Sequence, residues 1–187
     1  MIRRGLLALV AAAGLATAAA AQDAGTLVIE VDGGVQGTIE IALNPEAPQH
    51  AARLKELARA GAYDGVVFHR VIDGFMAQTG DVAFGTREAF GQGRAGTGGS
   101  SLPDLPAEFT DAPFERGTVG MARAQDPNSA NSQFFIMFAD GDFLNGQYTV
   151  VGEVTSGMEV VDRIRRGEGA NGEVSEPDWM AKVSVRE

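Results

Sequence analysis

The chain has 187 residues, of which 44% are hydrophobic, and its 15 basic and 25 acidic residues give a formal net charge of −10. Such an acidic chain is a poor partner for nucleic acid or for an anionic membrane surface, and we expect neither. The absence of cysteine excludes disulfides, thiolate metal sites and thiol catalysis.

The first 21 residues have the pattern of a secretory signal peptide. Arg3 and Arg4 precede an apolar stretch over residues 6–15, and small residues follow at 19–21. We predict cleavage after Ala21, with Ala20 as the alternative, which leaves a single domain over residues 22–187. The other interpretation is an uncleaved membrane anchor. Because the apolar stretch is shorter than the roughly 20 residues that span a bilayer, we expect no stable membrane association after cleavage.

Short strands dominate the rest of the chain. Hydrophobic residues alternate over 27–31 and 39–43 on either side of Gly33-Gly34, which predicts a β-hairpin. Further short apolar runs lie at 66–72, 75–79, 118–122, 134–138, 149–154 and 179–185. So many short strands indicate an antiparallel barrel or sandwich.

Two segments have helical spacing. Residues 48–60 have Pro48 in the first turn and end before Gly61. A second helix is predicted over 157–166, with Ser156 and Glu159 as a candidate capping box.

Residues 84–117 are rich in glycine and proline, and we predict no regular structure there. A loop of this length inside a domain is usually functional or mobile. For residues 85–94, a tolerated surface insertion is an equal alternative, and their role stays open.

The positions of the histidines and serines in the sequence do not favour a metal site or a serine hydrolase. His50 falls in a predicted helix and His69 in a predicted strand, without the spacing of a ligand pair, so we expect no metal and no cofactor. The candidate serines lie in loop-like sequence without a G-x-S-x-G turn: Ser100, Ser129 and Ser132.

Three segments together have a recognisable composition and order. The first is FHRVIDGFMAQTGD at 68–81, the second joins GMARA at 120–124 with NSQFFI at 131–136, and the third is FLNGQYTVVG at 143–152. In this order and at this spacing they resemble the cyclophilins, and the likeness extends over residues 26–186. The resemblance implies a peptidyl-prolyl cis/trans isomerase that is mainly β, with a closed antiparallel eight-stranded β-barrel capped by two α-helices.

The residues themselves agree with this resemblance. In strands, Met76 and Gln78 would share a face, as would Gln133 and Phe135. If these faces point outward, rings and amides meet in a shallow groove that suits a proline ring between peptide bonds. The alternate positions are predicted to be core: Phe134, Ile136 and Phe138.

The resemblance also implies a role for each site residue. Arg70 would be the catalytic guanidinium, and Gln78 its neighbour on the substrate backbone. The proline pocket would be lined by Phe75, Met76, Phe135 and Leu144. The residues before proline would be held by Ala122, Gln133 and the backbone of Arg123, and Gly96 would let the substrate chain approach closely.

Three positions depart from the best-known eukaryotic pattern. Arg123 replaces Asn, Phe143 replaces Trp, and Tyr148 replaces His. Phe143 lacks the indole N–H of the family's cyclosporin contact, so we expect weak cyclosporin sensitivity, whereas Tyr148 keeps an aromatic body at the pocket rim. Such substitutions are typical of bacterial members and, with the predicted signal peptide, indicate a periplasmic protein.

The implied chemistry needs no covalent step. Rotation about an Xaa-Pro bond has a barrier of about 20 kcal/mol because it breaks amide conjugation. A donor directed at the prolyl nitrogen would act only in the twisted transition state, and the permanently charged Arg70 is suited to this.

The expected partners are proline-containing unfolded or partly folded polypeptides, bound by a monomer. The alternative is a non-catalytic proline-peptide binding module or chaperone, which would keep the groove and lose Arg70 or Gln78. A scaffolding protein would not need polar groups that converge on an apolar groove.

Overall fold

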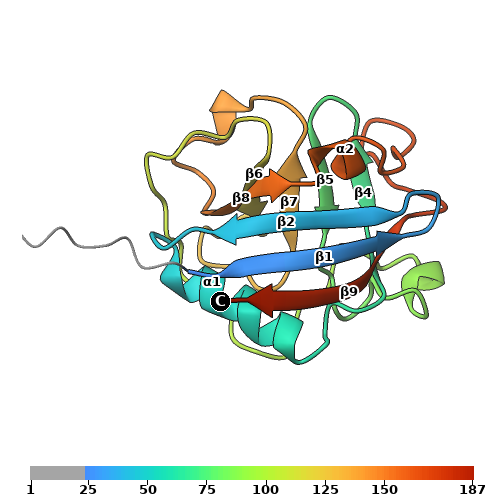
Figure 1. The fold of residues 1–187 in the computed structure, drawn as a ribbon, viewed down its shortest axis with the longest axis horizontal. Coiled ribbons are helices and arrows are strands. Elements are labelled where there is room, and N and C mark those ends of the chain that lie inside the picture. The colour runs from blue at the N-terminus through green and yellow to red at the C-terminus, as the bar shows by residue number, and fades with distance from the viewer. Residues whose placement is uncertain (1–23) are drawn as a thin grey trace, which may run out of the picture.

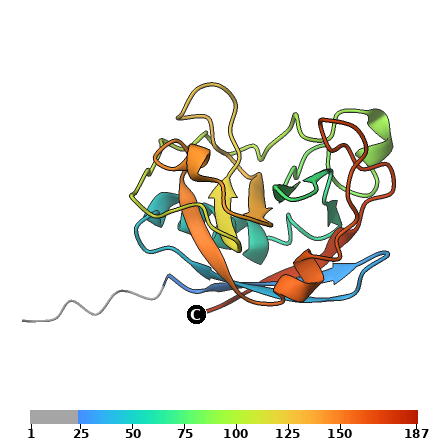
Figure 2. The same ribbon diagram turned by 90° about the horizontal axis from the view of Figure 1, so that it is seen from above.

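The computed structural model describes residues 24–187, and the predicted signal peptide lies outside them. One strongly curved antiparallel sheet forms most of this region (Figures 1 and 2). Its strands are β1 (Thr26–Asp32), β2 (Gly37–Leu43), β3 (Val66–Val67), β4 (Arg70–Ile72), β5 (Met76–Thr79), β6 (Thr118–Met121), β7 (Phe134–Met137), β8 (Val150–Ser156) and β9 (Trp179–Arg186). They are ordered β3-β9-β1-β2-β8-β6-β7-β5-β4. The predicted hairpin is confirmed as β1 and β2.

The sheet is open, so the closed eight-stranded barrel expected from the resemblance is wrong. Its edges, β3 and β4, do not pair with each other. The run over 66–72 was expected as one strand, but it breaks at Phe68, whose N–H donates to the Asp178 carbonyl at 2.9 Å. The nearest link across the opening is from Thr79 on β5, next to the edge strand β4, whose hydroxyl donates to the Val67 carbonyl on β3 at 2.9 Å. The result is a curled, nine-stranded half-barrel.

Loops cover both edges of the sheet. The N–H of Val67 on β3 donates to the Gly85 carbonyl at 2.8 Å, and the N–H of Val71 on β4 donates to the Gly172 carbonyl at 2.7 Å. Such cover removes free edge groups that would otherwise pair with another chain. Within residues 84–117 the regular element is the short 3-10 helix η1 (Phe90–Gln92), close to the prediction, and a second, η2, spans Asp142–Leu144.

The first predicted helix is confirmed and the second is shorter than predicted. α1 spans Pro48–Arg59, packs against β9, and is followed by Gly61 with φ +69°. α2 spans only Met158–Val161, and its N-cap is Gly157 with φ +89° and no side-chain cap. The expected capping box is therefore wrong, because Ser156 is still paired with Glu40 in the sheet. No helix within residues 24–187 has the length and apolar character needed to cross a bilayer.

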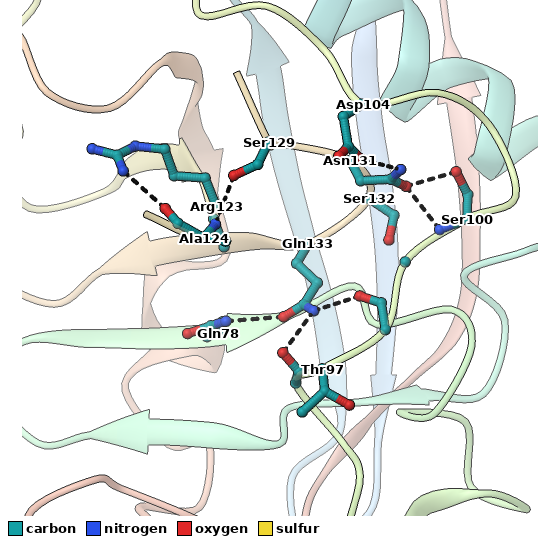
Figure 3. A pocket seen from close by; sticks show the side chains of 14 residues that line it. Gln78, Thr97, Ser100, Asp104, Arg123, Ala124, Ser129, Asn131, Ser132 and Gln133 are labelled. Atoms are coloured by element: carbon teal, nitrogen blue, oxygen red, sulfur yellow. Dashed lines mark hydrogen bonds between the residues drawn. The ribbon is translucent and has the colours of Figure 1, made fainter. Parts of the chain in front are cut away.

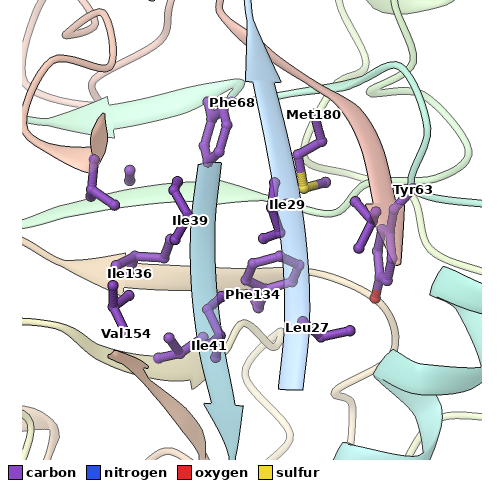
Figure 4. Close-up of a cluster of buried hydrophobic side chains, with 14 of the residues drawn as sticks. Leu27, Ile29, Ile39, Ile41, Tyr63, Phe68, Phe134, Ile136, Val154 and Met180 are labelled. Atoms are coloured by element: carbon purple, nitrogen blue, oxygen red, sulfur yellow. The ribbon is translucent and has the colours of Figure 1, made fainter. Parts of the chain in front are cut away.

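The sheet separates two groups of buried apolar side chains. The larger group fills the concave side, where Figure 4 shows side chains of β1 and β2 packed beside Phe134 and Ile136 of β7. The smaller group includes Phe135 and Met137, the alternate residues of the same strand. Phe134, Ile136 and Phe138 are core residues, as predicted. The outward face of β7 is the floor of the candidate site.

Candidate active site

Strand register places the candidate residues in one row across the sheet. Arg70 on β4 is opposite Gln78 on β5, Gln78 is opposite Phe135 on β7, and Phe135 is opposite Gly120 on β6. Directly opposed residues in antiparallel strands have neighbouring side chains on the same face. The pairing therefore confirms that Gln78 and Phe135 share the outward face.

Gly120 makes room for the phenyl ring at the centre of this row. A Cβ at Gly120 would overlap the Phe135 ring and lie 2.6 Å from Cε1 of Phe114. The ring centroids of Phe114 and Phe135 are 5.8 Å apart in a stacked arrangement. Glycine on β6 thus lets the Phe135 ring lie flat over the neighbouring strand.

Arg70 is held by two neutral acceptors. Its Nε donates to the Asn171 carbonyl at 2.9 Å, and its Nη1 donates to Gln78 Oε1 at 3.0 Å. Within residues 24–187, Arg70 makes no ion pair, and its Nη2 donates no hydrogen bond. The guanidinium is therefore fixed in orientation while its charge stays uncompensated.

The amides of Gln78 and Gln133 continue this arrangement toward the 96–98 loop (Figure 3). Gln78 Nε2 donates to Gln133 Oε1 at 2.9 Å. Gln133 Nε2 then donates to the carbonyls of Gly96 at 3.1 Å and Gly98 at 2.7 Å. Because Arg70 can only donate at one end and the two carbonyls can only accept at the other, each amide has a single favourable orientation.

An apolar hollow of about 300 Å³ lies beside Arg70 and Gln78. The Phe75 and Phe143 rings are 5.5 Å apart, and Phe135 and Tyr148 meet edge-on at 5.9 Å. Phe143 is 65% exposed. The structure brings together here the residues predicted for the proline pocket, its rim and its polar edge: Arg70, Phe75, Met76, Gln78, Ala122, Arg123, Phe135, Phe143, Leu144 and Tyr148.

A second hollow, of about 450 Å³, adjoins the first and was not predicted (Figure 3). The two share Gln78, Ala122 and Arg123. Its walls are polar and include the predicted Gly96 and Gln133 together with Ser100, Asp104, Ser129 and Asn131. Gly96 and Ser129 are 33 positions apart, so no local sequence pattern reveals the cavity between them.

The Arg123 side chain packs on the Tyr148 ring at the rim of the first hollow. Its guanidinium lies 4.5 Å from the centre of the Tyr148 ring and donates to the carbonyls of Gln147 and Ala124 at 3.0 and 2.9 Å. These contacts leave the backbone of Ala122 and Arg123 between the two hollows. Arg123 therefore shapes the rim and orders the loop that follows β6.

Gly96 has a conformation that requires glycine. Its φ is +91°, and a Cβ there would lie 3.1 Å from the His69 ring. His69 is buried, and neither ring nitrogen has a hydrogen-bond partner of ordinary geometry. Burial lowers the pKa of His69 to about 4, although the nearby Asp81 charge opposes this shift. The imidazole is therefore neutral at pH 7 and packs beneath the loop.

The other histidine lies in a separate environment. His50 Nδ1 is 2.7 Å from Glu108 Oε2, at the start of α1. Residues 24–187 contain no cluster of histidine, aspartate and glutamate arranged to hold a metal ion.

Comparison with known proteins agrees with this geometry. The family profile described as cyclophilin type peptidyl-prolyl cis-trans isomerase matches residues 26–185. A probable peptidyl-prolyl cis-trans isomerase of Brucella suis is 58% identical over 172 residues, which cover 90% of this chain and 86% of that protein. Peptidyl-prolyl cis-trans isomerase B of Escherichia coli is 37% identical over 138 residues, covering 64% and 73% of the two chains.

Solved structures share the fold. A cyclophilin from Hirschia baltica superposes with a TM-score of 0.70 at 27% identity, covering 85% of this chain and 73% of that one. A cyclophilin-type isomerase of Cryptosporidium parvum, solved in the presence of the dipeptide Ala-Pro, superposes with a TM-score of 0.73 at 23% identity, covering 87% and 99%.

The family profile over residues 26–185 and the identity to named relatives, together with the shared fold, assign the chain to the class of proline-directed isomerases. The chain belongs to the cyclophilin family and is a peptidyl-prolyl cis-trans isomerase.

Proposed function

We propose that this chain isomerises Xaa-Pro bonds of polypeptides folding in the periplasm, with Arg70 as the catalytic residue. The observation that carries the mechanism is the state of the Arg70 guanidinium. It stands at the edge of the apolar hollow, is held by the Asn171 carbonyl and Gln78, and has no carboxylate partner within residues 24–187.

In the proposed mechanism, Arg70 has a task specific to the transition state. As the Xaa-Pro bond twists, conjugation is lost and the prolyl nitrogen becomes a hydrogen-bond acceptor. Nη2 of Arg70, which donates no hydrogen bond within residues 24–187, would donate to that nitrogen in the twisted state. In the planar ground state the nitrogen lone pair is conjugated and cannot accept this bond. Such a contact lowers the barrier without strengthening ground-state binding.

The two hollows divide the substrate between them. Phe75, Met76, Phe135 and Leu144 hold the proline ring while the preceding carbonyl rotates. The residues before proline lie along Ala122, Arg123 and Gln133 toward the polar hollow beside Gly96. The substrates are proline-containing unfolded or partly folded chains, and one copy of the protein carries a complete site.

The test of the mechanism is Arg70→Ala. Loss of a donor directed at developing charge typically lowers the rate by about 10²–10³-fold. We expect this loss in kcat/KM on a proline tetrapeptide, measured by NMR exchange, with the thermal midpoint nearly unchanged. Arg186→Ala, which removes an exposed arginine paired with Glu40, is the matched control and should be fully active. Equal activity of the two variants would overturn the role of Arg70.

We also propose that residues 1–21 direct export and are removed. The basic start, the apolar stretch and the small residues before Gln22 support this. Expression of the full chain in a Gram-negative host should give a periplasmic protein whose N-terminus, by mass spectrometry, is Gln22 or Ala21. A protein that retains residues 1–21 in the membrane fraction would contradict the proposal.

A further inference from the structure

Asp81 is a buried carboxylate directly behind the active-site groove. It follows β5 by two residues, its side chain is completely inaccessible, and it makes no ion pair within residues 24–187. It lines neither hollow. A buried carboxylate needs several directed donors to offset the loss of water.

Four backbone N–H groups supply those donors. Oδ1 accepts from Ala83 at 3.1 Å and Phe84 at 2.9 Å, within the turn that follows β5. Oδ2 accepts from Gly96 at 2.8 Å and Gly98 at 2.9 Å. One carboxylate therefore ties the 96–98 loop to the end of the strand that carries Gln78.

The same two glycines face the groove with their carbonyls. Gly96 and Gly98 donate N–H to Asp81 and accept from Gln133 Nε2 with C=O. These carbonyls require the nitrogen of Gln133 on their side, so its oxygen points to Gln78. Gln78 must then present its oxygen to Arg70, as observed.

We propose that Asp81 is a positioning residue for the isomerase reaction: by holding the 96–98 loop it sets the direction of the Gln133–Gln78 amide chain that aims Arg70. A displaced loop removes the acceptors of Gln133 Nε2, so the amide chain is then fixed only at its Arg70 end. Gln78 and Gln133 would then be free to shift together, and Arg70 Nη1 would lose its fixed acceptor. This inference rests on the proposed role of Arg70.

The test compares two buried aspartates. Asp81→Asn keeps the shape and can still accept from Ala83 and Phe84, but its NH₂ would oppose the N–H groups of Gly96 and Gly98. Asp178→Asn is the matched control, because Asp178 is 1% exposed, accepts from the N–H groups of Val35 and Arg165, and lines neither hollow.

We expect both variants to lose thermal stability to a similar extent, while only Asp81→Asn lowers kcat, by about tenfold or more. The side-chain amide signals of Gln78 and Gln133 in ¹H–¹⁵N spectra should shift in Asp81→Asn and stay in place in Asp178→Asn. Equal kcat and unshifted amides in the two variants would show that Asp81 has only a structural role.

A second variant decides the matter if Asp81→Asn does not fold. A Cβ at Gly98 would lie 2.5 Å from Asp81 Oδ1 and 2.7 Å from the Phe84 ring, so Gly98→Ala separates the loop from an intact carboxylate. It should give the same loss of kcat and the same amide shifts. Arg70→Ala, measured in parallel, separates the two proposals. Full activity of that variant refutes the role of Arg70, whereas unshifted amides in Gly98→Ala refute the role of Asp81.

Discussion

The side-chain amide of Gln78 donates to that of Gln133 across 2.9 Å, although the two residues are 55 positions apart in the chain. This bond joins the arginine at one end of the groove to the 96–98 loop at the other. Neither amide is free to turn over, because each has a donor or an acceptor fixed on its far side.

Gln78→Glu should lower activity by giving Arg70 a carboxylate partner. The new charge would stand about 3 Å from the guanidinium, in the place of the present oxygen, and would face Gln133 Oε1. We expect kcat/KM on a proline tetrapeptide to fall at least about tenfold, since a paired arginine is less available to the prolyl nitrogen. Gln36→Glu adds the same charge at the exposed β1–β2 turn and should leave activity unchanged. Wild-type activity of Gln78→Glu would contradict this prediction.

Substitution of Phe143 should weaken substrate binding alone, whereas substitution of Phe135 should also lower the stability of the fold. Phe143 is 65% exposed and packs on Phe75, so Phe143→Ala should raise KM several-fold with little change in the unfolding free energy. Phe135 is 6% exposed, and Phe135→Ala should cost about 3–5 kcal/mol of stability as well as activity. Urea unfolding and steady-state kinetics on both variants make the comparison. Similar stability losses in the two would show that the pocket rim is part of the core.

Gly120→Ala should disturb the pocket floor without straining the backbone. The added methyl would overlap the Phe135 ring and approach Phe114. We expect a loss of about 1–3 kcal/mol, typical of overpacking, together with a raised KM as the ring is displaced. Gly91→Ala, whose Cβ would meet open space, is the control. A stable Gly120→Ala protein with normal KM would show that the ring can shift without consequence.

His69 should make the protein sensitive to acid. Its pKa is lowered to about 4 in the folded protein, against 6.5 for an unperturbed histidine, so unfolding between these values takes up a proton. The stability is fully present above pH 6.5 and falls by about 3 kcal/mol as the pH drops to 4.

The measurement is urea unfolding at pH 7, 5.5 and 4. Carboxylates also make the unfolding free energy depend on pH. The informative quantity is therefore the difference in unfolding free energy between the wild type and His69→Leu at each pH. That variant should lose less stability between pH 6.5 and 4. If the unfolding free energies of the two proteins fell in parallel with pH, a group other than His69 would be responsible for the acid sensitivity.

Local patterns predicted much of the fold. The alternation over 27–31 and 39–43 predicted β1 and β2, because strand side chains alternate between faces. Helical spacing with Pro48 and Gly61 predicted α1 closely. The second helix is shorter than predicted because the chain beyond Val161 continues in tighter turns, in which the N–H of Arg163 donates to the Val160 carbonyl and that of Ile164 to the Val161 carbonyl. The glycine that begins it, Gly157, is placed by close contact with Thr38 on β2.

The site residues divide in the same way. Arg70, Gln78 and the pocket rings could be recognised in the sequence because they lie in three compact motifs. The second hollow could not, since its walls come from the 96–104 loop and the 122–133 segment. The Asn171 carbonyl that holds Arg70 is a backbone group. Every residue has such a group, so the residue type at position 171 could not predict this contact.

The sequence by itself determined the family, the strand faces and the arginine that we propose as catalytic, because each depends on residue type and short-range spacing. Tertiary structure alone decided that the sheet stays open, that Gln133 meets Gln78, and that Asp81 holds the loop opposite them. Those outcomes depend on register and on hydrogen bonds between residues far apart in the chain, which local pattern does not encode.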